Sequence, residues 1–394
     1  MPSPLEGRRI WFAGIGGAGM SGYALLAHAW GAQVCGWDRV ATPYLAHLPE
    51  DVAVDLGGEP TPPHGWEVVV STAFAGRIPG TTRAEFLAEL VDRRDAIVVA
   101  GAHGKSTTTA MIAFVLRELG RDPSFLIGAD VPQLGGNAAA GSGWLVVEGD
   151  ESDRTIEALR PKIAVVTNVD LDHHTTFASR AEVEELFDAW LARATNAVRG
   201  DALPAYDGEL AVPGLHNRRN ATAALAALEA AGVARADAAP VLAAFRGVGR
   251  RLEQRGKAAG VQVVDDYGHH PAEAAAALEA LRGRGGRVLV LFQPHLYSRT
   301  RYLAREFGAA LAAADVAAVT DIYPAREEPI EGVTGKLIVD ALSEARPGMP
   351  IGWMPARDDA ARFLATRARD GDTVLTLGAG DVDGVIPLLL ELLG

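Results

Sequence analysis

Cysteine is almost absent from this chain. Only Cys35 occurs among 394 residues, so no disulfide within the chain and no cysteine-based metal cluster can form. Cys35 lies in the apolar stretch Gln33-Val34-Cys35-Gly36, which is typical of a buried structural thiol rather than of a nucleophile.

Long apolar runs and basic clusters are also scarce. Residues 1–9 contain no apolar run that would act as a secretion signal, and stretches such as 382–393 are too short or too interrupted to span a bilayer. The formal net charge is -13 and no long Lys/Arg run occurs, which argues against a nucleic-acid partner. We therefore expect a cytoplasmic protein that binds neither nucleic acid nor membranes. Nucleotides are not excluded, because a local nest of backbone N–H groups can hold phosphates in an acidic protein.

The composition present is that of a folded protein, with 48% hydrophobic and 22% charged residues. A chain of 394 residues is too long for one ordinary core. Strand and helix patterns alternate and restart twice, which predicts an α/β fold with parallel sheets and three domains at 1–93, 94–247 and 248–394. The expected strands are 10–13, 67–71, 96–100, 144–147, 163–167, 288–292, 316–320 and 373–377, with one more ending at 38; the expected helices are 18–30, 83–91, 181–194 and 217–231.

A first glycine loop, Gly14-Ile15-Gly16-Gly17-Ala18-Gly19, follows the first predicted strand and precedes a helix. Such glycines let a backbone approach a diphosphate, and the helix N-terminus adds partial positive charge. Asp38 ends the next strand, where an acidic side chain can accept ribose hydroxyls. A dinucleotide-binding dehydrogenase or a tight packing turn would show the same pattern, so this loop alone decides nothing.

A second glycine loop is more specific. The apolar strand 96–100 runs directly into Gly101-Ala102-His103-Gly104-Lys105-Ser106, and Thr107 continues into a helix. In a phosphate-binding loop the lysine contacts the terminal phosphates and the serine hydroxyl ligates magnesium. Val99 stands where the usual pattern has its first glycine, so the loop is a variant.

Carboxylates and a histidine follow the next two strands. Strand 144–147 leads into Glu148-Gly149-Asp150-Glu151-Ser152-Asp153, and strand 163–167 leads into a segment that contains His173. Four carboxylates within six residues repel each other unless a cation or hydrogen-bond donors lie among them. Because carboxyl ends of parallel strands share one edge of a sheet, the pattern indicates a metal site beside the second glycine loop. A solvated acidic loop is the alternative.

Further polar motifs lie toward the C-terminus. His216, Asn217 and Asn220 open an alanine-rich helix on which the two asparagines, three positions apart, share one face suited to a purine edge or to an N-terminal cap. The motifs 249–253, 264–271 and 293–300 follow. Paired arginines such as those at 250 and 251 suit bidentate recognition of phosphates or carboxylates.

Taken in this order, these motifs resemble the Mur ligase family over nearly the whole chain. The stretches 101–109 and 216–220 are general family features, whereas Gly14–Gly22 and 267–271 resemble the branch that adds L-alanine to UDP-N-acetylmuramate. The resemblance implies a Rossmann-like N-terminal domain for the UDP-sugar, a P-loop ATPase-like central domain and a Rossmann-like C-terminal domain. It also implies ATP and Mg²⁺ as cofactors and a role in peptidoglycan synthesis, with the protein a monomer or a homodimer.

The resemblance assigns roles to residues. The UDP-sugar-binding set is Gly14, Gly16, Gly17, Gly19, Met20, Ser21 and Asp38. The ATP-binding set is Gly101, His103, Gly104, Lys105, Ser106, Thr107, His216, Asn217, Asn220, Arg251 and Asp266. The metal ligands are Ser106, Glu151 and His173, and the catalytic set is Lys105, Glu151, His173 and Arg251. Tyr267, His269 and Arg299 are candidates for binding the substrate carboxylates or deprotonating the amine.

The chemistry implied is an attack of the lactyl carboxylate on the γ-phosphorus of ATP, followed by displacement of phosphate from the acyl phosphate by the alanine amine. Four features differ from the family pattern. Thr175 replaces an acidic residue two positions after His173, and residues 75–79 replace an Asn-Pro-Glu element. Leu296 replaces an arginine, and only 43 positions (216 minus 173) separate His173 from His216, which indicates a shortened central domain. The alternatives are a related ligase that adds another amino acid or a peptide to a UDP-sugar, and a non-catalytic UDP-sugar-binding paralogue.

Overall fold

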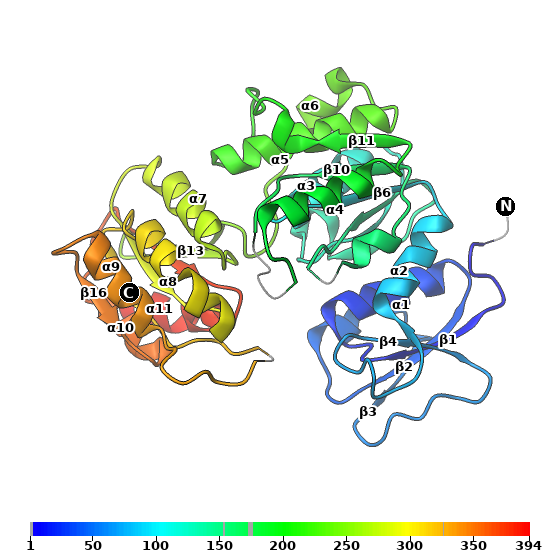
Figure 1. The fold of residues 1–394 in the computed structure, drawn as a ribbon, viewed down its shortest axis with the longest axis horizontal. Helices are drawn as coiled ribbons and strands as arrows, with labels where there is room; N and C mark the ends of the chain where they lie inside the picture. The colour runs from blue at the N-terminus through cyan, green and yellow to red at the C-terminus, as the bar shows by residue number, and fades with distance from the viewer. Residues whose placement is uncertain (1–2, 153, 172–175, 326) are drawn as a thin grey trace. The chain divides into compact units, whose positions relative to one another are not determined.

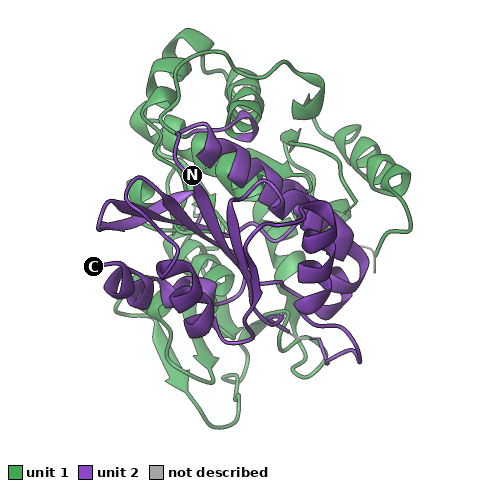
Figure 2. Ribbon diagram, turned by 90° about the vertical axis from the view of Figure 1, so that its left-hand side faces the viewer, with its two compact units in different colours: residues 1–212, 217–248 green, residues 213–216, 249–394 purple. Residues whose placement is uncertain are grey.

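Three β-sheets organise the chain in the computed structural model, which describes residues 3–152, 154–171, 176–325 and 327–394 (Figure 1). The chain divides into two compact units (Figure 2). Unit 1 comprises residues 1–212 and 217–248, and unit 2 comprises residues 213–216 and 249–394. Two sheets belong to unit 1 and the third belongs to unit 2.

The first sheet of unit 1 is parallel, with the strand order β3-β2-β1-β4-β5. Its strands are β1 (Arg9–Ala13), β2 (Gln33–Asp38), β3 (Ala53–Leu56), β4 (Glu67–Val70) and β5 (Thr81–Thr82). Helices α1 (Ala18–Ala29) and α2 (Arg83–Asp92) contribute to the main core, whereas Trp11, Trp37 and Phe74 form a smaller aromatic cluster. Cys35 lies on β2 beside that cluster, half-buried, and burial raises the pKa of its thiol to about 11.

The second sheet of unit 1 has the order β11-β10-β6-β9-β7-β8 and is parallel except for β8. Its strands are β6 (Ala96–Ala100), β7 (Ser124–Leu126), β8 (Ala138–Ala139), β9 (Leu145–Glu148), β10 (Ile163–Val166) and β11 (Asn196–Arg199). Helices α3 (Lys105–Glu118), α5 (Leu215–Ala230) and α6 (Arg235–Ala243) bury one face, and α4 (Arg180–Leu191) packs on the other. Continuous apolar strands such as Ala96–Ala100 are expected where both faces of a parallel sheet are covered.

The two sheets of unit 1 share a core, because residues on one face of the second sheet join the cluster formed by α1 and α2. Contact is also direct: a Cβ placed on Gly22 of α1 would lie 2.8 Å from Leu126 Cδ2 of β7. The helix that follows the first glycine loop therefore packs against β7, a strand of the second sheet.

Strand β11 is the last strand of the second sheet along the chain. A single 3-10 turn follows it, and then the segment 203–214, which contains no helix or strand. This segment is tied to α5: Arg218 Nη1 donates to the Tyr206 carbonyl (2.8 Å), and Thr222 Oγ1 donates to the Pro204 carbonyl (2.8 Å). A short connection thus occupies the region where the sequence predicted a shortened domain. That 3-10 turn is Gly200–Ala202, and the others are Pro43–His47, Pro132–Leu134, Thr155–Ala158 and Val382–Val385.

The sheet of unit 2 has the order β12-β13-β17-β14-β15-β16, with only β12 antiparallel among these strands. Helices α7, α8 and α9 bury one face, and α10 and α11 bury the other. The strands are β12 (Glu253–Ala258), β13 (Val261–Asp266), β14 (Val288–Phe292), β15 (Val316–Val319), β16 (Ile351–Trp353) and β17 (Thr373–Leu377). The helices are α7 (Pro271–Arg282), α8 (Tyr297–Leu311), α9 (Lys336–Ala345), α10 (Arg357–Ala365) and α11 (Ile386–Leu393).

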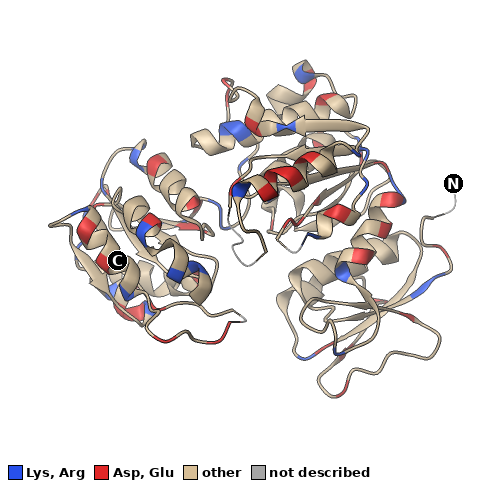
Figure 3. Ribbon diagram, viewed as in Figure 1, with Lys and Arg blue, Asp and Glu red and all other residues tan. Residues whose placement is uncertain are grey.

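The α/β fold with parallel sheets predicted from the sequence is confirmed, and the predicted strands and helices recur within a few residues of their expected bounds. The division into three domains stays a prediction. Acidic and basic residues are interspersed along both units (Figure 3). Among the described residues, none of the helices has both the length and the apolar composition needed to cross a bilayer.

Candidate active site

The second glycine loop lies between β6 and α3 in unit 1, and two of its glycines have backbones that favour glycine, with φ of 128° at Gly101 and 81° at Gly104. A Cβ at Gly101 would lie 2.3 Å from Thr167 Oγ1, and one at Gly104 would lie 2.3 Å from Asn220 Oδ1. The loop leads into a helix without an acidic residue in its first turn or a side-chain cap. A helix N-terminus of this kind is suited to phosphate.

Lys105 begins α3 and contacts a buried carboxylate. Its Nζ donates to the Gly101 carbonyl (2.7 Å) and to both carboxylate oxygens of Glu151 (2.9 and 3.1 Å). Glu151 is only 2% exposed. Burial acts to lower the pKa of Lys105, but the neighbouring charges of Glu151, Asp150 and Glu148 outweigh it, so the net pKa is raised. The lysine is therefore charged and held at the loop.

Ser106 pairs with a different carboxylate, which sequence reasoning did not assign to the metal site. Its Oγ donates to Glu148 Oε2 (3.1 Å), and the Gly128 amide donates to Glu148 Oε1 (2.5 Å). Serine and carboxylate oxygens are the ligands that Mg²⁺ prefers. Of the predicted metal ligands, Ser106 thus lies with Glu148, Glu151 lies with Lys105, and His173 falls outside the described residues. One signal for Glu148 was available: it is the carboxylate at the end of its strand.

The carboxyl end of β10 holds the middle of the loop. Thr167 Oγ1 and Asn168 Nδ2 donate to the His103 carbonyl (2.6 and 2.8 Å), and the His103 amide donates to Asn168 Oδ1 (3.0 Å). Nε2 of His103 lies 3.6 Å from a carboxylate oxygen of Asp170. The strand edges predicted to converge on this loop do so.

The residues expected at adenine are divided between the units. Asn217 and Asn220 are buried in unit 1, 3.4 Å apart between Asn217 Oδ1 and Asn220 Nδ2, and Asn220 adjoins Gly104. His216 belongs to unit 2, where burial, together with the charge of Arg251, lowers the pKa of its imidazole to about 4. His216 is therefore neutral at physiological pH.

The first glycine loop is tied to the strand edge of its own sheet. The Gly16 amide donates to Asp38 Oδ2 (2.8 Å), and Thr42 Oγ1 donates to the Gly16 carbonyl (2.6 Å). Asp38 thus supports the loop. Two predicted UDP-sugar contacts, Met20 and Ser21, are 3% and 2% exposed, so their side chains pack in the core.

Arg83, which sequence reasoning did not single out, lies beside the first glycine loop. Its Nη1 would be 3.5 Å from a Cβ on Gly19. Arg83 is the first residue of α2, where a cation is disfavoured by the helix dipole. Helix α1 has no acidic residue in its first turn and no side-chain cap. The charge around Gly19 therefore favours an anion.

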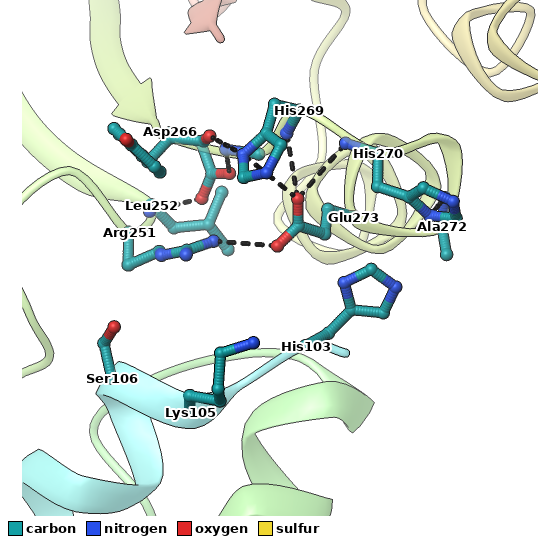
Figure 4. A network of polar contacts seen from close by, with 12 residues as sticks. His103, Lys105, Ser106, Arg251, Leu252, Asp266, His269, His270, Ala272 and Glu273 are labelled. Carbon is teal, nitrogen blue, oxygen red and sulfur yellow. Dashed lines mark hydrogen bonds and ion pairs between the residues drawn. The ribbon is translucent and has the colours of Figure 1, made fainter. Parts of the chain in front are cut away.

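Unit 2 holds a second charged cluster at the ends of β13 and α7 (Figure 4). Asp266 accepts hydrogen bonds from the amides of Leu252 and Gly268 (both 2.8 Å), and Arg251 Nη1 lies 3.2 Å from Glu273 Oε1. Burial raises the pKa of Asp266 to about 6, although Arg251 and the two amides oppose that rise.

The three substrate candidates all lie in unit 2 around one histidine pair. The His269 ring packs edge-on against Tyr267 (centroids 5.5 Å apart) and lies 5.8 Å from His295, whose Nδ1 is 3.3 Å from Arg299 Nη1. Leu296 is the N-cap residue of α8 in the same region, with φ of 71°, a conformation that is strained for a leucine. The structure thus gathers Tyr267, His269 and Arg299 in one cluster.

In unit 1, a glycine loop, a charged lysine, a serine and acidic strand ends meet at the carboxyl edge of a mostly parallel sheet. These are the features of the phosphate-binding site of P-loop nucleotide-binding proteins, and the site belongs to that class.

Comparison with known proteins gives the family. Residues 99–197 match the model of the Mur ligase middle domain, and residues 250–380 match the Mur ligase, glutamate ligase domain. The chain is 40% identical to the UDP-N-acetylmuramate--L-alanine ligase of Streptomyces coelicolor, covering 99% of this chain and 98% of the relative. It is 41% identical to the enzyme of that name from Paenarthrobacter aurescens, covering 98% and 97%. The chain belongs to the Mur ligase family.

Solved structures agree. The UDP-N-acetylmuramate-alanine ligase MurC of Thermotoga maritima is 25% identical with a TM-score of 0.76, covering 97% of this chain and 98% of that one. A murein peptide ligase of Psychrobacter arcticus, 24% identical with a TM-score of 0.66, shares the fold. The alignment with the Streptomyces coelicolor enzyme runs over 467 positions, so at least 73 of them (467 minus 394) have no residue of this chain.

Proposed function

We propose that this chain is an ATP-dependent ligase that forms an amide bond between the lactyl carboxylate of UDP-N-acetylmuramate and L-alanine, a step of peptidoglycan precursor synthesis in the cytoplasm. The observation that carries the proposal is the intact phosphate site of unit 1, with Lys105 on Glu151 and Ser106 on Glu148. The names of its full-length relatives give the substrates.

The second glycine loop binds the phosphates of ATP for the first step, the transfer of the γ-phosphoryl group to the lactyl carboxylate. Lys105 exchanges one or both oxygens of Glu151 for the phosphate oxygens of ATP, while the amides at the start of α3 hold the same phosphates. The lactyl carboxylate oxygen attacks the γ-phosphorus, the bond to the β-phosphate oxygen breaks, and ADP leaves with that electron pair. The products are ADP and an acyl phosphate.

Mg²⁺ fits the residues beside the loop. Once Lys105 contacts phosphate, Glu151 would lack its counter-charge, and Ser106 and Glu148 would offer two further oxygen ligands. We propose that these three residues hold the ion, which would neutralise the phosphate charge. A magnesium titration tests this: Glu148→Gln and Glu151→Gln should both raise the Mg²⁺ concentration needed for half-maximal activity, and an unchanged requirement in both would contradict the proposal.

The second step uses unit 2. The alanine amine attacks the acyl carbonyl, a tetrahedral intermediate forms, and inorganic phosphate leaves as the amine loses its proton. Arg251 is proposed to bind the γ-phosphate and Asp266 the ribose. The cluster of Tyr267, His269 and Arg299 is proposed to bind the alanine carboxylate, since a buried guanidinium beside two imidazoles suits an anion.

The first glycine loop is proposed to bind the diphosphate of UDP rather than a dinucleotide. Uncapped amides at the start of α1 and the guanidinium of Arg83 near Gly19 support this. Asp38, whose Oδ2 already accepts from Gly16, is proposed to keep the loop in shape while its carboxylate faces the ribose.

A second candidate is a ligase that adds a different amino acid or a peptide. Leu296 favours it, because an apolar, strained residue precedes α8 beside the proposed carboxylate site. A phosphate-release assay with ATP, UDP-N-acetylmuramate and a panel of amino acids separates the two. We expect turnover with L-alanine, and robust turnover with another amine but none with alanine would exclude the first proposal. A Lys105→Ala variant with unchanged turnover would exclude the assigned phosphate site.

A further inference from the structure

Glu273, in the first turn of α7, lies at the centre of the contacts around Arg251 (Figure 4). One carboxylate oxygen, Oε1, is 3.2 Å from Arg251 Nη1. The other, Oε2, accepts the amides of His269 and His270 at 2.9 and 3.2 Å. The side chain is only 10% exposed, so its carboxylate is shielded from water and fixed in place.

The main chain of Arg251 is already fixed by other contacts. Its neighbours Arg250 and Leu252 adopt left-handed conformations, with φ of 56° and 48°. Arg250 Nε donates to Asp265 Oδ2 (2.8 Å), its Nη2 donates to the Gly378 carbonyl (2.9 Å), and the Leu252 amide donates to Asp266. Two strained residues persist only where surrounding contacts determine them. What remains to be fixed is the direction of the Arg251 side chain.

Two groups in unit 2 set that direction. The Tyr267 ring lies 5.4 Å from Arg251 Cζ, and Glu273 accepts the one hydrogen bond that Arg251 makes to a side chain within the described part of the chain. A ring contact restrains a guanidinium without orienting its N–H groups, whereas a hydrogen bond orients them. Since arginine has five N–H donors, the contact with Glu273 leaves donors for a phosphate.

The structural alternative is that Glu273 merely caps α7. His270 and Glu273 form a capping box, and Oε2 alone makes the amide contacts of that box. A capping box can have either glutamine or glutamate at the position of Glu273, so the cap does not require a negative charge. The contact of Oε1 with Arg251 is additional to the cap.

We infer that Glu273 is a positioning residue for Arg251: its carboxylate ties the guanidinium to the first turn of α7 and so fixes the donors that Arg251 presents to the γ-phosphate. The inference rests on the proposed function of Arg251. Neighbouring His216 contributes no competing positive charge, because it is neutral.

The test compares ligands with and without a γ-phosphate. Calorimetry on the full chain, with Mg²⁺ and UDP-N-acetylmuramate, gives the ratio of affinities for a non-hydrolysable ATP analogue and for ADP. The variants are Glu273→Gln, which keeps the cap, Glu273→Asp as a second variant, Arg251→Gln, and the double variant Arg251→Gln with Glu273→Gln. The control is Glu85→Gln, because Glu85 closes the capping box of α2 with Thr82 and is exposed.

We expect the analogue-to-ADP ratio to fall about 10-fold in Glu273→Gln, the effect of one charge-assisted hydrogen bond. The ratio should fall at least as far in Arg251→Gln, and the double variant should show no larger fall than Arg251→Gln alone. It should not change in Glu85→Gln. The KM for ATP should rise in parallel while affinity for ADP stays within about twofold.

The outcomes separate the inference from the function on which it rests. A ratio that falls in Arg251→Gln but not in either Glu273 variant would overturn the inference and leave the role of Arg251 intact. A higher ratio in Glu273→Gln would also overturn it, because the carboxylate would then be a competitor of phosphate. An unchanged ratio in Arg251→Gln would remove the proposed role of Arg251 and the inference together.

Discussion

Replacement of Lys105 by methionine should destabilise unit 1 as well as stop catalysis. The substitution keeps the length of the side chain but leaves Glu151 without its cation. The Glu151 side chain is 3% exposed, so its charge would remain in a poorly hydrated site. Lys105→Met thus perturbs folding through its partner rather than through lost packing.

The magnitude follows from the burial of the two side chains. Removing one partner of a buried ion pair costs about 3 to 5 kcal/mol. Lys105 is 21% exposed, which lets water reach the pair, so we expect the lower end, about 3 kcal/mol. Glu151→Gln leaves Lys105 its bond to the Gly101 carbonyl and should cost about 1 to 2 kcal/mol. The double variant should be less destabilised than Lys105→Met alone, with a coupling energy of about 2 kcal/mol.

The assay is urea unfolding of the four proteins followed by tryptophan fluorescence. All seven tryptophans except Trp353 lie in unit 1, so the signal reports mainly that unit. The matched control is the pair Lys162–Asp95, 2.7 Å apart but 45% and 61% exposed, for which a coupling below about 0.5 kcal/mol is expected. A coupling for Lys105 and Glu151 no larger than that of the control pair would refute the reasoning.

Three further predictions concern single residues. Gly101→Ala should abolish binding of ATP while binding of UDP-N-acetylmuramate persists, because the new Cβ would collide with Thr167; calorimetry with each ligand checks this, and retained ATP affinity would contradict it. Arg83→Gln should weaken binding of UDP about 10-fold but not that of uridine, with exposed Arg121→Gln as the control; equal losses for both ligands would show that no phosphate contact was removed. Because Asp266 is protonated up to about pH 6 in the folded chain but only to about pH 4 when unfolded, the stability it contributes falls as pH rises through that window. The change in the free energy of unfolding caused by Asp266→Asn should therefore be more favourable at pH 7.5 than at pH 4.5. Urea unfolding of variant and parent at both pH values measures this, and a more favourable change at pH 4.5 would contradict the prediction.

The central strands could be predicted from the sequence because each is a continuous run of apolar residues, which is typical of a strand buried on both faces. Ala96–Ala100 and Val288–Phe292 are buried at every position and could be recognised without knowledge of their neighbours. The edge strand Glu253–Ala258 was missed, since its sequence Glu-Gln-Arg-Gly-Lys-Ala is polar and none of its residues is fully buried. Only its pairing with β13 makes it a strand.

The site was predictable where its chemistry is local. Lys105 and Ser106 are adjacent in one loop, so their roles follow from the loop itself. Which carboxylate accompanies which donor was not predictable, because Glu148 and Glu151 lie three positions apart and their partners come from another segment. The pairing of Arg251 with Glu273 spans 22 positions and depends on how α7 follows β13.

The solitary thiol of Cys35 has a practical consequence. Thiolate is the form that reacts with maleimides, and with a pKa of about 11 only about one thiol in 10⁴ is ionised at pH 7. Cysteines introduced at exposed positions should therefore outcompete the native one for dyes or spin labels without its prior replacement. One label on each unit would then allow energy transfer or electron paramagnetic resonance to test whether nucleotide binding changes the distance between the labels.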